Sequence, residues 1–433
     1  MTGEGDRPGW RRHAAVAVAA LVVINILAQT VLFRQSLGEG DIASRMQPYT
    51  DAEDYMGRAR RLAEGDGFSS VFRDGIRMPG YPLFLALFSA AGDDQARAVR
   101  IAQIVLSASI IALAYLCLST LAPGGPLPLV GAVLAAFWLP FYYFSRVLYA
   151  ETPSIICVAL LCMLLSRFDP DRPLRILLPA AAVTAAAVYL KPNLAVLLPV
   201  LLAFAAFATA RAGRPLGPVT LLAPVVLIAA LVAPWTIFIS AEQGRFVPLS
   251  THGGWNLYLG SGGGNAYDKQ WAEGSLPEKI WERLGLRDSG SASGEYDRVP
   301  ATERAAADAR MRRLAAQRWR AAPAKLTAYG IAKVLHSFGF SLRGPRDYAV
   351  ALHFAAAMAA SIVLWTRRRY REWALLLWAF AIVVAFQAFL FIGELRFKTV
   401  LFDFPALIVI TLGIGSIIGT TGMAAALRAA KGR

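Results

Sequence analysis

Long apolar runs separated by short polar segments dominate the chain. About ten of them are long enough to cross the ~30 Å hydrocarbon core of a bilayer as helices. They cover residues 14–33, 98–121, 127–145, 150–166, 174–190, 193–210, 217–239, 349–366, 373–392 and 404–424. Glycine, alanine and proline are frequent in these runs, as membrane helices tolerate. The pattern predicts an all-α polytopic membrane protein with about ten transmembrane helices.

Basic residues in the short loops predict the orientation, because such residues favour the cytoplasmic side. With the N-terminal tail 1–13 and the basic C-terminal tail 425–433 inside, two long segments, 34–97 and 240–348, lie outside. The stretch 326–342 is then expected at the outer surface rather than across the membrane. The cytoplasmic basic residues are Arg7, Arg11, Arg12, Arg167, Arg172, Arg175, Arg211, Arg214, Arg367, Arg368, Arg369, Arg371, Arg428, Lys431 and Arg433.

Composition agrees with this class of protein. The chain is 56% hydrophobic and only 17% charged, which excludes a soluble protein. Its net charge of +15 comes from arginines scattered between apolar spans. This distribution reflects the orientation of the spans in the membrane and does not indicate a nucleic-acid partner. Cys117, Cys157 and Cys162 lie inside apolar runs without metal-ligand spacing. The run 14–33 is too long for a signal peptide and lacks a clear cleavage site, so it is predicted to remain as a helix.

The first outer segment carries a pair of carboxylates. The stretch DAEDYMGRARRLAEG predicts a helix over 52–64, closed by Gly65, with Asp51 and Asp54 on one face because they are three residues apart. A simpler interpretation is that Asp51 caps the helix while Asp54 favours its macrodipole. Local sequence leaves both interpretations open.

The short outer loops also carry ionisable residues, where the topology rule predicts few basic ones. They are Arg146 and Glu151 in SRVLYAETP, Lys191 in YLKPN, and Glu394, Arg396 and Lys398 in GELRFK. Each cation alone could be a snorkelling side chain. Together these groups suit the binding of an anionic lipid headgroup with activation of a hydroxyl. Arginine and lysine hold a phosphate, and a carboxylate accepts a proton or holds a divalent cation.

The second outer segment begins with a glycine-rich stretch, THGGWNLYLGSGGGNAY. We expect residues 253–264 to form a flap that offers Trp255, Asn256 and Tyr258 to a sugar, with an ordinary loop as the alternative. His252 is either a surface histidine or part of the site. The polar stretch 286–300 is expected to be mobile, and an Ala/Arg helix is predicted near 301–320.

In the order and loop placement of these motifs the chain resembles the GT-C glycosyltransferases. Within them it resembles the dolichyl-phosphate-mannose-protein mannosyltransferase relatives, which include bacterial lipid A aminoarabinose transferase. The resemblance covers nearly all of 14–424 and implies one membrane-embedded glycosyltransferase domain. It rests on Asp51 with Tyr55 and the following LAEGDGF, RMPGYPLFLAL (77–87), Glu151, Lys191-Pro192, GRFVPLSTHGGWNLYLG (244–260) and ELRFKTVLFDFP.

The resemblance also implies roles for individual residues. Asp51 matches the catalytic base, with Asp54 as second choice, and Glu151 would assist the site. By the resemblance, the donor phosphate would be bound by Lys191, Arg396 and Lys398. Arg77 and Arg146 are further candidates for that phosphate, and the candidates for substrate binding are Tyr55, Tyr81, His252, Trp255, Asn256, Tyr258 and Glu394. The family has an adjacent Asp-Glu pair where this chain has DAED. The base therefore stays open, as does a divalent cation (Mg²⁺, Mn²⁺ or Ca²⁺) on Asp51 and Glu151.

The resulting hypothesis is an enzyme of the cell membrane that acts on the extracytoplasmic face. It would transfer a sugar from a polyprenyl-phosphate donor to a lipid, glycan or protein hydroxyl, with inversion, in contact with membrane lipids. The alternative is a transporter or flippase for lipids or polyprenyl-linked sugars. That alternative predicts a site near the bilayer midplane, broken helices and related halves, but the sequence shows no internal repeat. A structural scaffold would not need carboxylates and cations in separate loops.

Overall fold

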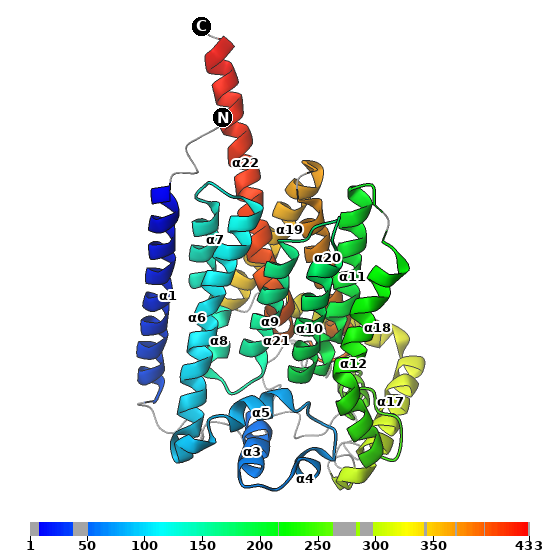
Figure 1. Cartoon of the computed structure of the whole chain (residues 1–433). Helices are drawn as coiled ribbons and strands as arrows, with labels where there is room; N and C mark the ends of the chain where they lie inside the picture. Colours follow the sequence, from blue (N-terminus) through cyan, green and yellow to red (C-terminus); the bar gives the residue numbers. More distant parts are fainter. Residues whose placement is uncertain are drawn as a thin grey trace.

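The computed structural model is helical throughout the part of the chain that it describes, and contains no strand there. The described residues are 8–37, 51–214, 216–262, 283–285, 298–341, 344–368, 370–393 and 395–431. Most of the long helices run side by side as a bundle, and the shorter helices α3, α4, α5 and α17 gather at one end of it (Figure 1). The C-terminal end of α22 projects from the opposite end.

The predicted spans all coincide with helices. Among the described residues, seven helical stretches are long and apolar enough to cross a membrane, and a bent pair makes an eighth. The seven contain α1 (Pro8–Leu37), α6 (Gln95–Leu121), α11 (Leu197–Arg211), α12 (Pro218–Glu242), α19 (Pro345–Thr366), α20 (Arg371–Leu390) and α22 (Phe404–Lys431). The remaining predicted spans are the shorter apolar helices α9 (Glu151–Leu165) and α10 (Leu174–Leu190). The chain is a multi-pass, all-α membrane protein, as predicted.

The bent span consists of α7 (Leu127–Ala136) and α8 (Leu139–Arg146), which meet at 47°. Pro140 lies in the first turn of α8, where its missing N–H is tolerated but prevents a continuous helix from α7. Trp138 is extended at the break, with ψ of 99°. The bend therefore places the indole of Trp138 inside the bundle rather than on a regular helix face.

The core lies where α6, α9, α10, α11, α20 and α22 meet, and it is filled by apolar side chains such as Trp373, Phe380 and Phe402. Small residues let the helices approach closely. A Cβ on Gly413 of α22 would meet Ala360 Cβ of α19 at 2.7 Å. Such contacts replace the hydrophobic driving force that lipid cannot supply between membrane helices.

Both long segments predicted to lie outside come together at the same end of the bundle (Figure 1). The first contains α3 (Asp51–Ala63), α4 (Phe68–Phe72), α5 (Gly80–Ala86) and η1 (Ser89–Asp94). The second contains α13 (Gly253–Gly260), η3 (Ala301–Glu303), α17 (Arg304–Ala321) and α18 (Pro323–Ser337). Thr251 joins the two, because its N–H donates to the carbonyl of Gly75 at 2.9 Å. One surface is thus built from chain segments far apart in sequence.

Several local predictions are confirmed. Helix α3 matches the predicted 52–64 to within one residue at each end, and Gly65 with φ of +86° follows it in the left-handed region that favours glycine. Helix α17 is the predicted Ala/Arg helix. The stretch 326–342 stays a prediction for the outer surface: helix α18, which covers most of it, packs against α20, buries Leu326 and Lys333, and is not among the candidate spans. Residues 286–297, expected to be mobile, lie outside the described part.

Candidate active site

Asp51, the first residue of α3, is held between two arginines from distant parts of the chain. Arg77 Nη2 donates to Asp51 Oδ1 at 2.5 Å, and Arg396 Nη1 donates to Oδ2 at 2.6 Å. Both carboxylate oxygens therefore accept from side chains. Asp51 therefore does more than cap the N-terminus of α3, which was the simpler interpretation of the local sequence.

The same contacts set the protonation of Asp51. Burial alone would raise the pKa of Asp51, but the guanidinium groups of Arg77 and Arg396 outweigh it and hold that pKa well below its usual range. Asp51 is therefore an anion at every physiological pH. While both arginines stay in place it is a weak base, because its negative charge is already compensated.

Glu151 and Lys191 form the second ion pair of the site, with Lys191 Nζ donating to Glu151 Oε1 at 2.6 Å. Glu151 begins α9 and its side chain is only 2% exposed. Lys191 ends α10 in an extended conformation that its following residue, Pro192, favours. Arg396 Nη1 lies 3.9 Å from Glu151 Oε1 and so links this pair to Asp51. The name outer ion cluster, taken from the segments that the sequence predicts to lie outside, is used below for Asp51, Arg77, Glu151, Lys191 and Arg396.

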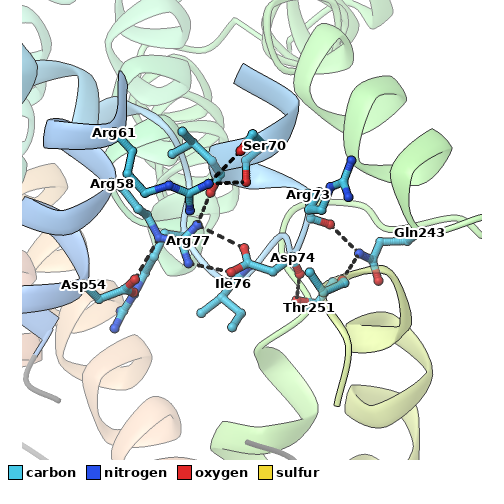
Figure 2. Close-up of polar contacts among 12 residues, drawn as sticks. Asp54, Arg58, Arg61, Ser70, Arg73, Asp74, Ile76, Arg77, Gln243 and Thr251 are labelled. Atoms are coloured by element: carbon cyan, nitrogen blue, oxygen red, sulfur yellow. Dashed lines mark hydrogen bonds and ion pairs between the residues drawn. The ribbon is translucent and has the colours of Figure 1, made fainter. Parts of the chain in front are cut away.

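Asp54 connects the outer ion cluster to a second network on α3 (Figure 2). Arg77 Nε donates to Asp54 Oδ2 at 2.7 Å, and Arg58 Nε donates to Asp54 Oδ1 at 2.9 Å. Arg58 also makes a bidentate pair with Asp74, at 3.1 and 2.6 Å. Burial would raise the pKa of Asp54, but Arg58 and Arg77 lower it overall. Sequence reasoning missed Arg58 and Asp74, although Arg58 stands four residues after Asp54 on the same helical face.

Aromatic rings line the outer ion cluster. The guanidinium of Arg77 lies 4.8 Å from the ring centroid of Tyr55, which meets Tyr81 edge to face at 4.9 Å. The Tyr81 hydroxyl donates to Gln103 Oε1 at 2.8 Å. Burial raises the pKa of Tyr55 to about 12, so its hydroxyl stays protonated. Tyr55 and Tyr81, both predicted to bind substrate, thus lie at the site.

Lys398 does not join the outer ion cluster, contrary to its predicted contact with the donor phosphate. Residues two apart on a helix face in different directions, so Arg396 and Lys398 of α21 (Leu395–Lys398) cannot both reach the same group. Lys398 is fully buried, and its Nζ lies 2.6 Å from Asp403 Oδ1. Trp138 Nε1 donates to Asp403 Oδ2 at 2.7 Å. His353 completes this interior group, with Nδ1 3.4 Å from Lys398 Nζ.

The pairing of Lys398 with Asp403 depends on an uncommon turn. Residues five apart on an α-helix point about 140° away from each other. Here η4 (Thr399–Asp403) is a π-helix, whose i→i+5 hydrogen bonds stack residues five apart. The buried pair, meaning Lys398 with Asp403, exists because of this turn, and sequence periodicity contains no signal for it.

The glycine-rich stretch 253–262 is a packed helix and turn rather than the predicted flap. Trp255 and Tyr258 are buried against α17, so they are not presented to a sugar as expected. A Cβ on Gly254 would meet the carbonyl oxygen of Asp308 at 2.0 Å, and one on Gly260 that of Leu390 at 2.2 Å. The glycines are needed for close packing. Residues 263 and 264 lie outside the described part.

The other predicted residues differ in placement. His252 precedes α13 and lies near Asp51, Asp54 and Arg77, and burial with the positive charge of Arg77 lowers its pKa to about 3. Asn256 is half-buried on α13. Arg146 Nε donates to the carbonyl of Tyr142 in its own helix, so the described contacts do not bring it to the outer ion cluster. Glu394 lies outside the described residues.

The carboxylates of the site show whether it could hold the divalent cation that the sequence left open. Among the described residues, no group of three His, Cys, Asp or Glu side chains is placed to hold a metal. Both oxygens of Asp51 accept from arginines, and Glu151 Oε1 pairs with Lys191. A divalent ion on these carboxylates would face three cations already paired with them. The residues in this arrangement do not fit a metal.

A multi-pass helical bundle with carboxylates and cations gathered at one end is compatible with a membrane glycosyltransferase. Residues 77–238 match the sequence model of the dolichyl-phosphate-mannose-protein mannosyltransferase family. This match confirms the resemblance to GT-C glycosyltransferases and supports a membrane glycosyltransferase of mannosyltransferase type. No curated protein and no solved structure matches the chain. The matched region contains Arg77, Glu151 and Lys191, whereas Asp51 and Arg396 join the site through their contacts.

Proposed function

We propose that the chain transfers a sugar from a polyprenyl phosphate to a hydroxyl acceptor on the outer face of the membrane, with inversion at the sugar carbon. The observation that carries this proposal is the outer ion cluster itself. Two carboxylates and three cations from separate segments meet at one end of an apolar bundle. The isoprenoid tail of the donor would lie along the helices while its phosphate reached the cations.

The ion pairs explain how the donor would activate the site. A phosphate monoester or diester is an acceptor-rich anion that competes with carboxylates for arginine and lysine. If it takes Arg396 and Lys191, Asp51 and Glu151 each lose a cation. Loss of Arg396 raises the basicity of Asp51, since that guanidinium is one of the two groups holding its pKa low. The base would thus become competent only when the donor is bound.

The chemistry that follows uses groups of this chain alone. Asp51, or Asp54 as second choice, accepts the proton of the acceptor hydroxyl as its oxygen attacks the sugar carbon. The bond from that carbon to the phosphate oxygen breaks on the opposite side, which gives inversion. Arg396 and Lys191 stabilise the negative charge that develops on the leaving phosphate. No step passes through a metal.

Activity of two conservative variants tests this mechanism. Asp51→Asn should keep expression and donor binding but lose roughly 10²-fold or more in turnover, the usual contribution of a general base. Asp54→Asn tests the second choice of base on the same helical face. The assay is transfer of radiolabelled mannose from polyprenyl-phosphate mannose to membrane extract, with turnover measured at saturating acceptor. Loss of turnover only in Asp54→Asn would move the base by three residues, and full turnover of both variants would refute the mechanism.

The outer-face orientation rests on the distribution of short-loop arginines and can be tested with single cysteines. The native Cys117, Cys157 and Cys162 are all buried, so a new surface thiol can be labelled selectively. Glu64→Cys on the first outer segment should react with an impermeant maleimide in intact cells. Asp171→Cys, in a predicted cytoplasmic loop, should react only after lysis. The reverse pattern would overturn the orientation.

A transporter of polyprenyl-linked sugars is the second candidate, because the bent α7–α8 span and the buried pair are features that transporters also use. The two functions are separated by reconstitution. A transporter moves the labelled donor across a vesicle membrane without changing it. An enzyme releases polyprenyl phosphate and leaves the sugar on an acceptor.

A further inference from the structure

A cavity of about 290 Å³ lies on the outer end of the molecule, next to Asp54. One side is the polar face of α3, and the other is the chain from Ser70 to Asp74 (Figure 2). Ligand sites usually measure ~300–1,000 Å³. The cavity therefore suits a small group such as a sugar ring, not a lipid tail.

The spacing along α3 connects the cavity to the outer ion cluster. Asp54, Arg58 and Arg61 line it and follow one another at intervals of four and three residues, so they share one face of the helix. Asp51 stands three residues before Asp54 on that face. Arg77 bridges the two carboxylates. A group bound in the cavity would therefore lie beside Asp54, at the edge of the proposed reaction centre.

Each of the three arginines that line the cavity, Arg58, Arg61 and Arg73, has a carboxylate partner. Arg73 Nε lies 3.8 Å from Glu242 Oε2. Arg58 is saturated by Asp54, Asp74 and the carbonyl of Val71. Arg61 donates to Asp66 Oδ2 at 2.8 Å and to Ser70 Oγ at 2.6 Å. An anionic ligand would have to displace carboxylates from these arginines. A neutral ligand with many hydroxyls would not, because each hydroxyl can donate to a carboxylate and accept from a guanidinium.

We propose that this cavity is the acceptor site, that it binds a neutral sugar unit of a glycan, and that Asp54 accepts a hydrogen bond from an acceptor hydroxyl there. This assignment rests on the transferase function proposed above. Val71 and Ala301 are the lining residues with apolar side chains, so the cavity offers hydrogen-bonding groups to sugar hydroxyls and few apolar side chains to pack against those of a peptide. The acceptor is thus a glycan rather than a phosphorylated molecule or a protein.

Gly57 offers a direct test, because it lines the cavity and a Cβ built on it meets nothing within 4 Å. Gly57→Cys would place a single accessible thiol in the cavity, since the three native cysteines are buried. The full chain in lipid nanodiscs is labelled with a maleimide in the presence of mannobiose, mannose 6-phosphate or a Ser/Thr peptide. Mannobiose should slow labelling several-fold, and the other two should not.

Arg60→Cys is the control for labelling, because Arg60 is exposed on the same helix and does not line the cavity. Its labelling rate should not respond to any of the three probes. Equal labelling of the Gly57→Cys variant with and without mannobiose would overturn the proposal. Protection by mannose 6-phosphate or by the peptide in place of mannobiose would overturn the assignment of a neutral glycan.

A larger side chain at the same position tests the role in transfer. Gly57→Trp should raise the acceptor KM about tenfold or more, equivalent to ~1.4 kcal/mol, while slow hydrolysis of the donor by water continues. Arg60→Trp is the matched control outside the cavity. Normal acceptor KM in Gly57→Trp would refute the site. Protection of the Gly57→Cys variant by mannobiose, without any transfer or hydrolysis in the unmodified protein, would instead refute the proposed function and leave the sugar site standing.

Discussion

The outer ion cluster and the buried pair use the same chemistry in opposite settings. In the outer ion cluster, Asp51 is 21% exposed and shares two arginines, and Arg396 also approaches Glu151. In the buried pair, Lys398 and Asp403 are both 0% exposed. The cluster is assembled from segments hundreds of residues apart, whereas the pair spans one turn of chain.

In the outer ion cluster a ligand can replace one partner of an ion pair, whereas in the buried pair it cannot. Side chains near the membrane surface can trade one anion for another, because water and a ligand can replace the partner that leaves. A buried charge has no replacement, so removal of its partner leaves an uncompensated charge in a medium of low dielectric. The outer ion cluster is therefore suited to binding a phosphate, and the buried pair to holding the π-turn that follows Arg396.

The largest expected effect comes from breaking the buried pair. Lys398→Met leaves Asp403 charged and unpaired, and should destabilise the protein by about 3–5 kcal/mol. Thermal unfolding in detergent micelles measures this loss. The double variant Lys398→Met with Asp403→Asn removes both charges and keeps an acceptor for Trp138 Nε1, so it should regain most of the stability. A double variant as unstable as the single one would show that the ion pair is not the cause.

Substitutions in the outer ion cluster should weaken donor binding more than they lower stability. Arg396→Ala removes the charged hydrogen bond proposed to the donor phosphate, which should cost on the order of 1.5–3 kcal/mol of donor binding, or about tenfold or more in affinity. The melting temperature should change far less than in Lys398→Met. Lys191→Ala should weaken donor binding to a similar extent, but it leaves the buried Glu151 with Arg396 at 3.9 Å, so its melting temperature should fall more than that of Arg396→Ala. Unchanged donor affinity in both variants, measured with labelled polyprenyl-phosphate mannose, would leave snorkelling as the explanation of these cations.

The smallest effect concerns His252, which faces Arg77, Arg304, Asp51 and Asp54 beside the outer ion cluster. Burial, then Arg77, lowers its pKa to about 3, whereas the unfolded side chain has a pKa of ~6.5. The unfolded state therefore binds the proton first. The stabilisation is complete above pH ~6.5 and is lost as the pH falls toward 3, with a loss of about 2 kcal/mol by pH 5.

Thermal unfolding of His252→Gln against pH isolates this contribution. The variant has no imidazole to protonate, so its melting temperature should fall less than that of the unmodified protein between pH 7 and pH 5. Equal slopes would mean that His252 titrates normally, and that the positive charge of Arg77 does not reach it.

Helical periodicity and loop charge were sufficient for the overall architecture and for part of the site. Apolar runs of membrane length predict the spans, because a bilayer accepts only segments that satisfy their own backbone hydrogen bonds. Asp51, Asp54 and Gly65 predict α3 and its polar face, and the motifs point to Glu151, Lys191 and Arg396. These features depend on the conformation of a short stretch of chain, or on whether that stretch lies in water or in lipid.

Tertiary structure alone decided which charged groups meet. It placed Arg77 and Arg396 on Asp51, and brought Asp403 to Lys398 through a π-turn that no hydrophobic period encodes. It also turned Trp255 and Tyr258 into core residues, because Gly254 and Gly260 admit backbone from α17 and α20 at distances that a Cβ would forbid. The sequence by itself determined the membrane class, the spans and the acidic helix. Each of these depends only on residues close together in the chain and on whether the segment lies in lipid or in water. The partners of each charge follow only from packing between segments far apart in the chain.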